Sequence, residues 1–194
     1  MIDSHLQLAV FRLNDMCVGV QEGMDRFLNT AFLEKMPGAE AVFSWLAKRA
    51  VRICLLSDYG RSDTEIILRR LGWTVDEGGT VQQVITRQQD RENPVLLAQQ
   101  IAGITHPRLS FSALDTPRLL QLANQARVHF NLAVCNGRSS YNELAVAPHH
   151  AMLDSLLQLP NFVLQHLPQP ELRAGTQERR NIPRLHLPRP LSRG

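Results

Sequence analysis

Short apolar runs alternate along the chain with longer stretches of helical periodicity. Each run has the length of a β-strand and is followed by polar or turn-forming residues. The run over 51–57 is continuous and apolar, which is typical of a strand buried on both faces of a sheet. The predicted strands are 6–11, 51–57, 81–86, 108–114 and 128–135.

The stretches between these runs carry helix start and stop signals. Ser62 and Glu65 have the spacing of a capping box, in which each side chain bonds the backbone amide of the other residue. Gly72 is placed to end that helix in a left-handed conformation. The other predicted helices begin beside a proline, at Pro37-Gly38, Asn93-Pro94 and Thr116-Pro117.

This alternation of strand and helix predicts an α/β fold. Its core would be a Rossmann-like, mainly parallel sheet between two layers of helices. Ligands bind to such sheets outside the carboxyl ends of the strands. We therefore expect the functional site at the polar residues after the first, second and fourth predicted strands, which are 12–15, 57–58 and 115–116.

Four stretches match, in order and spacing, the motifs of a known family. LAVFRLND (8–15) is similar to a first motif ending in Asp-x-Asp-Gly-Thr, and Ser57 stands at the Ser or Thr of a second. DRENP (90–94) lies where a basic third motif is expected, and ALDTPRL (113–119) is similar to a fourth. The chain thus resembles the haloacid dehalogenase-like (HAD) superfamily, and within it the phosphonatase-like hydrolases. The resemblance implies a three-layer HAD-like core over residues 1–166.

The sequence departs from this family at the positions that carry its chemistry. The resemblance implies a nucleophilic aspartate and an acid/base aspartate where this chain has Arg12 and Asn14. A protonated guanidinium cannot act as a nucleophile, and an amide cannot exchange a proton as a carboxyl group does. Only Asp115 remains of the three carboxylates that hold the family's Mg²⁺, because Leu119 replaces the last one. We therefore predict a degenerate member with no catalytic residue, no metal site and no cofactor.

The segment that would form the family's helical cap is short. Residues 17–37 separate the first motif from the next predicted helix, which leaves room for one helix over about 20–35. We expect a vestigial cap and an open crevice, from which water is poorly excluded. Apolar surface uncovered by the loss of the cap would favour self-association as a homodimer.

These departures favour a catalytically inactive HAD-like protein that acts as a binding or regulatory module. Its partner would be another protein or a small anionic ligand. The candidate ligand-binding residues are Arg12, Asn14, Ser57, Arg91 and Asp115. The resemblance places three of them, Arg12, Ser57 and Arg91, around the family's phosphate position, where a phosphate-type anion could still bind.

The alternative is a phosphatase or phosphonatase-like hydrolase of a small phosphorylated or phosphonate substrate. In that case Asp15 would take the nucleophile's place, with Mg²⁺ near Asp115. Two interpretations of Arg12 also stay open. Its guanidinium would either fill the vacated metal position and pair with Asp115, or extend along the strand end into solvent.

The net charge of +3 belongs to the C-terminal end of the chain. Six arginines and two glutamates over 168–194 give +4, which leaves −1 for the rest. Residues 167–194 also contain five of the eleven prolines, so they predict an irregular Pro/Arg-rich tail. No Phe, Tyr or Trp lies between its arginines, which argues against nucleic-acid binding.

Cysteine spacing and hydropathy indicate a cytoplasmic setting. The three widely separated cysteines suit neither a disulfide framework nor a zinc site, and we interpret Cys17 as an ordinary thiol. No apolar run approaches the ~20 residues that cross a bilayer, and no leader pattern is recognised.

Other candidate residues are interpreted as structural: His149-His150 as a helix start, Asp58 as a loop residue and Asp63 as a cap residue.

Overall fold

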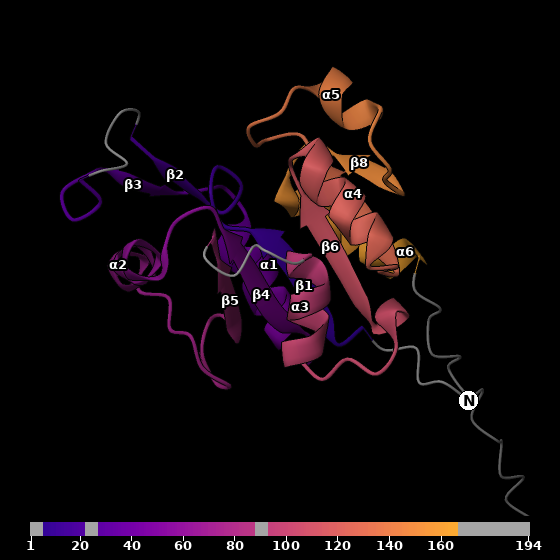
Figure 1. Cartoon of the computed structure of the whole chain (residues 1–194), viewed down its shortest axis with the longest axis horizontal. Helices are drawn as coiled ribbons and strands as arrows, with labels where there is room; N and C mark the ends of the chain where they lie inside the picture. The colour runs from indigo at the N-terminus through magenta and orange to yellow at the C-terminus, as the bar shows by residue number, and fades with distance from the viewer. Residues whose placement is uncertain (1–5, 22–26, 88–92, 167–194) are drawn as a thin grey trace, which may run out of the picture.

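A central sheet of parallel strands organises the structure (Figure 1). The computed structural model describes residues 6–21, 27–87 and 93–166. Over these residues the main sheet has six strands in the order β5-β4-β1-β6-β7-β8, and every neighbouring pair is parallel. The strands are β1 (Leu8–Arg12), β4 (Arg52–Ser57), β5 (Gln83–Thr86), β6 (Ser110–Leu114), β7 (Phe130–Val134) and β8 (Ala151–Leu153).

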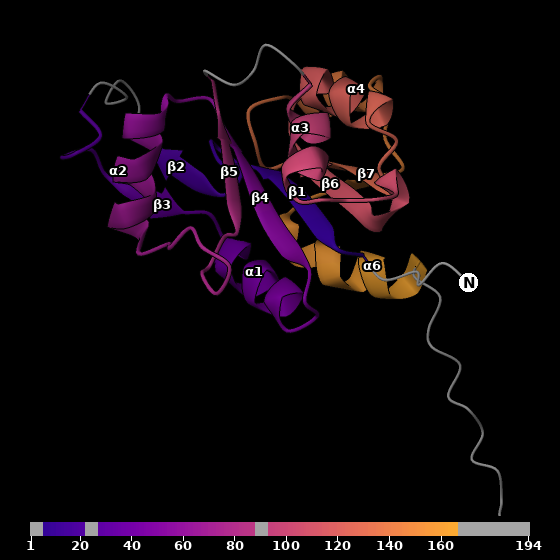
Figure 2. The same ribbon diagram turned by 60° about the horizontal axis from the view of Figure 1, so that its bottom comes forward.

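Helices cover both faces of this sheet, and Figure 2 shows the three layers. The helices α1 (Ala39–Ala47), α2 (Arg61–Leu71) and α6 (Leu159–His166) pack on one face. The helices α3 (Pro94–Ile101) and α4 (Pro117–Gln125) pack on the other. The predicted three-layer α/β/α core is therefore confirmed. None of the described helices is long and apolar enough to span a membrane. The short helices are α5 (Tyr141–Ala145), η2 (Pro107–Leu109) and η3 (Leu156–Gln158).

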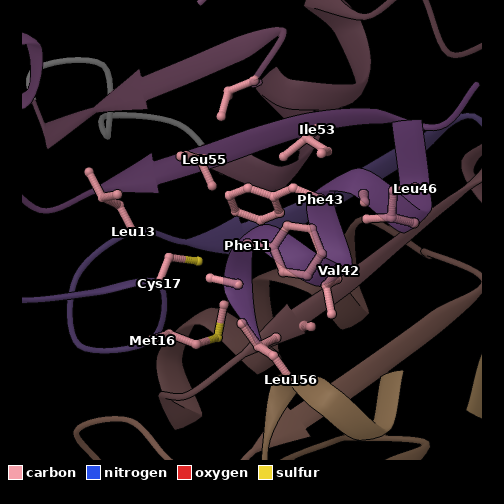
Figure 3. Packing of buried hydrophobic residues seen from close by; sticks show 14 of the residues in the cluster. Phe11, Leu13, Met16, Cys17, Val42, Phe43, Leu46, Ile53, Leu55 and Leu156 are labelled. Atoms are coloured by element: carbon pink, nitrogen blue, oxygen red, sulfur yellow. The ribbon is translucent and has the colours of Figure 1, made fainter. Parts of the chain in front are cut away.

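The alternation of side chains along β1 divides the core in two. Ala9 and Phe11 face the cluster that contains α1, whereas Leu8 and Val10 face the cluster that contains α3 and α4. Figure 3 shows Phe11 packed beside Phe43, and their ring centroids are 5.6 Å apart. Fully burying a side chain of this size contributes roughly 1.5–3 kcal/mol, so β1 is anchored from both faces.

The five predicted strands are confirmed, but the last strand was not predicted. Strand β8 begins directly after His149-His150, so the predicted helix start at this pair is wrong. The backbone amide of His150 donates to the carbonyl of Asn131 at 2.7 Å, and the amide of Asn131 donates to Nδ1 of His150 at 3.0 Å. These bonds tie His150 to β7. Strand β8 was missed because three residues are too few to show periodicity.

Helix start signals are confirmed where a cap residue precedes a proline. The Asn93 side chain accepts from the amides of the second and third residues of α3, and the Thr116 side chain accepts from the amide of Leu119. The predicted capping box at Ser62 is wrong, because α2 begins at Arg61 after Gly60 and has no side-chain cap. Asp63 consequently lies within the first turn of α2.

The described residues of the segment predicted to be a vestigial cap form two paired strands and not the predicted helix. Strands β2 (Val18–Val20) and β3 (Leu33–Lys35) pair antiparallel in a separate two-stranded sheet. Arg70 of α2 holds the residues just before β3. Its Nη1 donates to the carbonyl of Leu28 and, at 2.7 Å, to that of Ala31. Residues 167–194, for which an irregular tail is predicted, lie outside the described part of the chain.

We predict that Asn93→Ala lowers the free energy of unfolding by about 1–2 kcal/mol, because it removes the cap of α3. It also removes the 2.7 Å bond from Asn93 Nδ2 to the carbonyl of Leu122 in α4. Ser62→Ala should cost nothing, since Ser62 is an exposed residue inside α2. Urea denaturation measures both changes. An equal loss in Ser62→Ala would mean that Ser62 caps the helix after all.

Candidate functional site

Arg12 ends β1 at the carboxyl edge of the sheet, and its side chain is buried. Only 2% of the residue is exposed. Its Nη1 donates to Oδ2 of Asp115 at 2.8 Å, and Asp115 directly follows the neighbouring strand β6 and is fully buried. The interpretation that Arg12 pairs with Asp115 is confirmed. The alternative, in which Arg12 extends into solvent, is wrong.

Two further carboxylates contact the same guanidinium. Asp58, which follows β4, accepts from Nε of Arg12 at 3.2 Å and also from Nη2. Asp15, which follows β1, lies with Oδ2 3.4 Å from Nη2 of Arg12. The side chains of Asp58 and Asp15 are 52% and 48% exposed, so both carboxylates keep contact with water. One cation and three carboxylates give the cluster a formal charge of −2.

Asn14 holds the backbone of Asp58 in place. Its buried Oδ1 accepts from the backbone amide of Asp58 at 2.9 Å, which fixes the turn after β4 against the turn after β1. The prediction placed Asp58 in a loop but missed its contact with Arg12. The missed signal was its position, because Asp58 directly follows a strand that neighbours β1.

The loop after β7 closes over Asp115. The backbone amide of Arg138 donates to Oδ2 of Asp115 at 3.0 Å. A Cβ atom on Gly137 would lie 1.9 Å from the same oxygen, so only glycine fits there. Oδ1 of Asp115 is buried without a hydrogen-bond partner among the described residues. Asp115 is therefore enclosed by protein, and Arg12 is the cation that compensates its charge.

Burial and charge act against each other on this pair. Burial raises the pKa of Asp115, although the charge of Arg12 and the Arg138 amide both oppose the shift. Burial disfavours the charged form of Arg12, but its bond to Asp58 and the charges of the three carboxylates outweigh burial and raise its pKa. Burial also raises the pKa of the nearby Cys17 thiol, which agrees with an unreactive cysteine.

Arg12, Ser57 and Arg91 are the three residues predicted to surround a phosphate-type anion. Ser57 lines the same pocket as Arg12, but its hydroxyl is hydrogen-bonded at 2.8 Å to that of Thr64 and accepts the amide of Tyr59 at 3.2 Å. Arg91 lies outside the described residues. The guanidinium of Arg12 already contacts three carboxylates.

A pocket of about 300 Å³ opens beside this cluster, at the carboxyl edge of the sheet. None of the described residues of β2 and β3 lines the pocket. Two of its lining residues, Arg118 in α4 and Arg138 in the loop after β7, were not predicted as site residues. The lining is Arg12, Leu56, Ser57, Asp58, Ile85, Thr86, Pro94, Thr116, Arg118, Leu119 and Arg138.

The described residues do not fit the Mg²⁺ ion that the resemblance implies. A hard divalent cation needs several anionic oxygens around it. Here Asp115 directs Oδ2 to the guanidinium of Arg12, and the amide oxygen of Asn14 is engaged by the backbone of Asp58. A metal ion next to Asp115 would therefore have to displace or approach a buried positive charge.

Comparison with solved structures shows that the fold is that of the haloacid dehalogenase-like hydrolases. A hydrolase from Pseudomonas syringae superposes with a TM-score of 0.67 at 13% identity, over 83% of this chain and 99% of that one. A protein described as a haloacid dehalogenase-like hydrolase from Bacteroides fragilis gives 0.65 at 14% identity, over 79% and 99%.

A D,D-heptose 1.7-bisphosphate phosphatase from B. bronchiseptica, solved in complex with magnesium and phosphate, gives a TM-score of 0.61 at 16% identity. It covers 83% of this chain and 99% of that chain. No family model matches the sequence, and no curated protein matches it significantly. The likeness therefore concerns the fold, and the phosphonatase-like branch stays a prediction.

We predict that Arg12→Ala lowers the free energy of unfolding by about 3–5 kcal/mol, because it leaves Asp115 buried without its counter-ion. The double variant Arg12→Ala/Asp115→Asn should lose less, since the uncompensated charge is removed as well. Arg61→Ala is the matched control, because it breaks an exposed pair with Glu65 that is worth at most about 0.5 kcal/mol. Denaturation curves of wild type and the three variants measure these differences. A double variant no more stable than Arg12→Ala would contradict the ion-pair argument.

The free energy of unfolding that Arg12→Ala loses should depend on pH. Without the guanidinium, burial would raise the pKa of Asp115 further. A carboxyl group whose pKa is raised by folding stabilises the fold fully below its unfolded pKa of about 3.9, and that contribution is lost as pH rises through the folded pKa. The gap between wild type and Arg12→Ala should therefore widen from acid to neutral pH. Melting temperatures across this range measure it, and a constant gap would contradict the explanation.

Proposed function

We propose that this chain is a non-catalytic HAD-fold protein that acts as a binding or regulatory module. The observation that carries this proposal is the ion pair at the end of β1. Arg12 occupies the strand end from which the resemblance expects a nucleophilic carboxylate, and it points into the space between Asp15, Asp58 and Asp115. A buried cation at this place neutralises the carboxylate that a metal-dependent hydrolase would use.

The chemistry of the remaining groups supports the same proposal. Covalent catalysis needs an activated nucleophile within reach of a general base. Asn14 cannot exchange a proton, and its amide oxygen is engaged by the backbone of Asp58. Cys17 is fully buried, with a raised pKa that keeps it a thiol. None of these groups, in the arrangement described, activates a nucleophile.

The alternative hydrolase would depend on Asp15. This residue has a left-handed backbone conformation with φ of 60° and a half-exposed side chain that contacts Arg12. For Asp15 to attack a substrate, its carboxylate would have to leave Arg12 and reach the position now filled by the guanidinium. We therefore expect Asp15 to have no role in turnover.

We predict no Mg²⁺-dependent release of phosphate from phosphate monoesters by the wild-type chain. The double variant Arg12→Asp/Asn14→Asp restores two carboxylates beside Asp115, so millimolar Mg²⁺ should raise its melting temperature. The melting temperature of wild type should not respond to Mg²⁺. Phosphate release and thermal melting are measured on both proteins.

Asp15→Ala is the control for the alternative. Turnover by wild type that disappears in Asp15→Ala would identify Asp15 as a nucleophile and contradict the proposal. Stabilisation of the wild-type chain by Mg²⁺ would contradict the argument that Arg12 excludes a metal ion.

A further inference from the structure

Positive charge gathers at the amino edge of the sheet, which is the edge opposite the ion-pair cluster. This edge carries the residues just before β4, β6, β7 and β8 and the ends of α1, α3, α4 and α6. The described residues there are 47–52, 102–109, 126–130, 147–150 and 166. They contain no Asp or Glu, and their Lys and Arg residues, called here the amino-edge cations, are Lys48, Arg49, Arg52, Arg108 and Arg127.

The register of the sheet brings these cations to one level. Arg52 at the start of β4 and Ser110 at the start of β6 pair with the same residue of β1. The amide of His129 donates to the carbonyl of Ser110 at 2.7 Å, which places the start of β7 beside them. Arg108 and Arg127 each lie two residues earlier in the chain. Neighbouring strands are ~4.8 Å apart, so the edge from β4 to β7 spans about 15 Å.

None of the amino-edge cations forms an ion pair with a described residue. Four of them are exposed, and Arg52 is half-buried. The next described carboxylates along this edge, Asp76 and Glu77, lie in the turn before β5 and stay unpaired with Arg52. The four helix ends contribute roughly half a negative charge each, which offsets less than half of the five positive charges. The edge therefore keeps an excess of positive charge.

The basic end of the chain continues from the same edge. Helix α6 ends at His166, whose ring centroid lies 6.1 Å from that of Phe130 at the start of β7. Residues 168–194 follow and contain six Arg and two Glu. The rest of the chain carries −1, and the half-exposed carboxylates of Asp15 and Asp58 lie at the opposite edge. Positive charge is thus concentrated on one side of the molecule.

The chemistry of this edge favours carboxylates over a nucleic acid. Single-stranded nucleic acids are held by base stacking on free aromatic faces. Here the ring of Trp45 is covered by the guanidinium of Arg49 at 4.1 Å, and Phe130 is buried. Guanidinium groups form paired hydrogen bonds with carboxylates. Side chains on one face of an extended segment repeat every ~6.8 Å, so about three alternate acidic residues span the 15 Å of this edge.

We propose that the amino edge is a docking surface for an acidic segment of another protein, an extended stretch with Asp or Glu at alternate positions, and that Arg108 and Arg127 are its central contacts. This surface lies opposite the ion-pair cluster. Its role therefore goes beyond the proposed function and does not depend on the absence of turnover.

Fluorescence polarisation of a labelled peptide of alternating glutamate and serine, titrated with the full chain, tests the proposal. The peptide should bind saturably at low ionic strength, and its affinity should fall as salt rises. A peptide with glutamine in place of glutamate should not bind. A single-stranded oligonucleotide and a duplex of the same net charge should both bind more weakly than the acidic peptide.

Two double variants of equal charge locate the surface. Arg108→Gln/Arg127→Gln should weaken binding about fivefold or more, because it removes two ion pairs with the peptide. Arg61→Gln/Arg87→Gln removes the same charge from exposed residues at the carboxyl edge and should change the affinity less than about twofold.

Arg127→Gly separates binding from folding. Arg127 follows α4 with a left-handed φ of 55°, a conformation that glycine adopts after α2 and α3, at Gly72 and Gly103. Glycine has no steric cost at this place, so the variant should keep or raise the melting temperature. It should nevertheless weaken peptide binding, which a loss of folding could not explain.

Absence of saturable binding of the acidic peptide would overturn the proposal. Equal weakening by the two double variants would overturn it too, since the binding would then reflect general charge. Binding that Arg108→Gln/Arg127→Gln and Arg127→Gly leave unchanged would place the contact elsewhere in the chain. An oligonucleotide that binds as tightly as the peptide would contradict a carboxylate partner.

Discussion

The pairing of Arg12 with Asp115 constrains the whole carboxyl edge of the sheet. A buried carboxylate without a counter-ion costs several kcal/mol, and the 2.8 Å contact with the guanidinium offsets that cost. Because the two residues end neighbouring parallel strands, β1 and β6 must keep their register for the pair to form. The loop at Gly137 lies so close to the carboxylate of Asp115 that no side chain fits at position 137.

The same interaction determines what chemistry the site can support. In the HAD-like fold, the carboxyl edge of the sheet is where ligands are expected, and here that edge carries a cation within a set of carboxylates. The proposed loss of hydrolysis follows from this arrangement. The guanidinium of Arg12 contacts three carboxylates, so it is not free to bind a substrate anion.

Sequence patterns predicted five of the six strands of the main sheet, because these five are apolar and followed by polar or turn-forming residues. The Arg12–Asp115 pair was predicted as one of two interpretations from the family resemblance, which implies that the two positions lie at neighbouring strand ends. Sequence patterns failed where the signal was short or non-local. The hairpin at β2 and β3 was expected to be a helix, because three-residue strands show no periodicity and Arg70 holds the segment from a distant helix. The role of Arg138 depends on a loop conformation that sequence spacing does not encode, whereas the position of Asp58 directly after a strand was a signal that the sequence did contain.

The most direct test of the central claim is a crystal structure of the wild-type chain grown with Mg²⁺ and a phosphonate. We expect the guanidinium of Arg12 to remain on Asp115, with no metal ion on that carboxylate. A Mg²⁺ ion coordinated by Asp115, with Arg12 turned away from it, would contradict the claim. It would mean that a metal ion displaces Arg12 from Asp115 and that the chain still binds the metal.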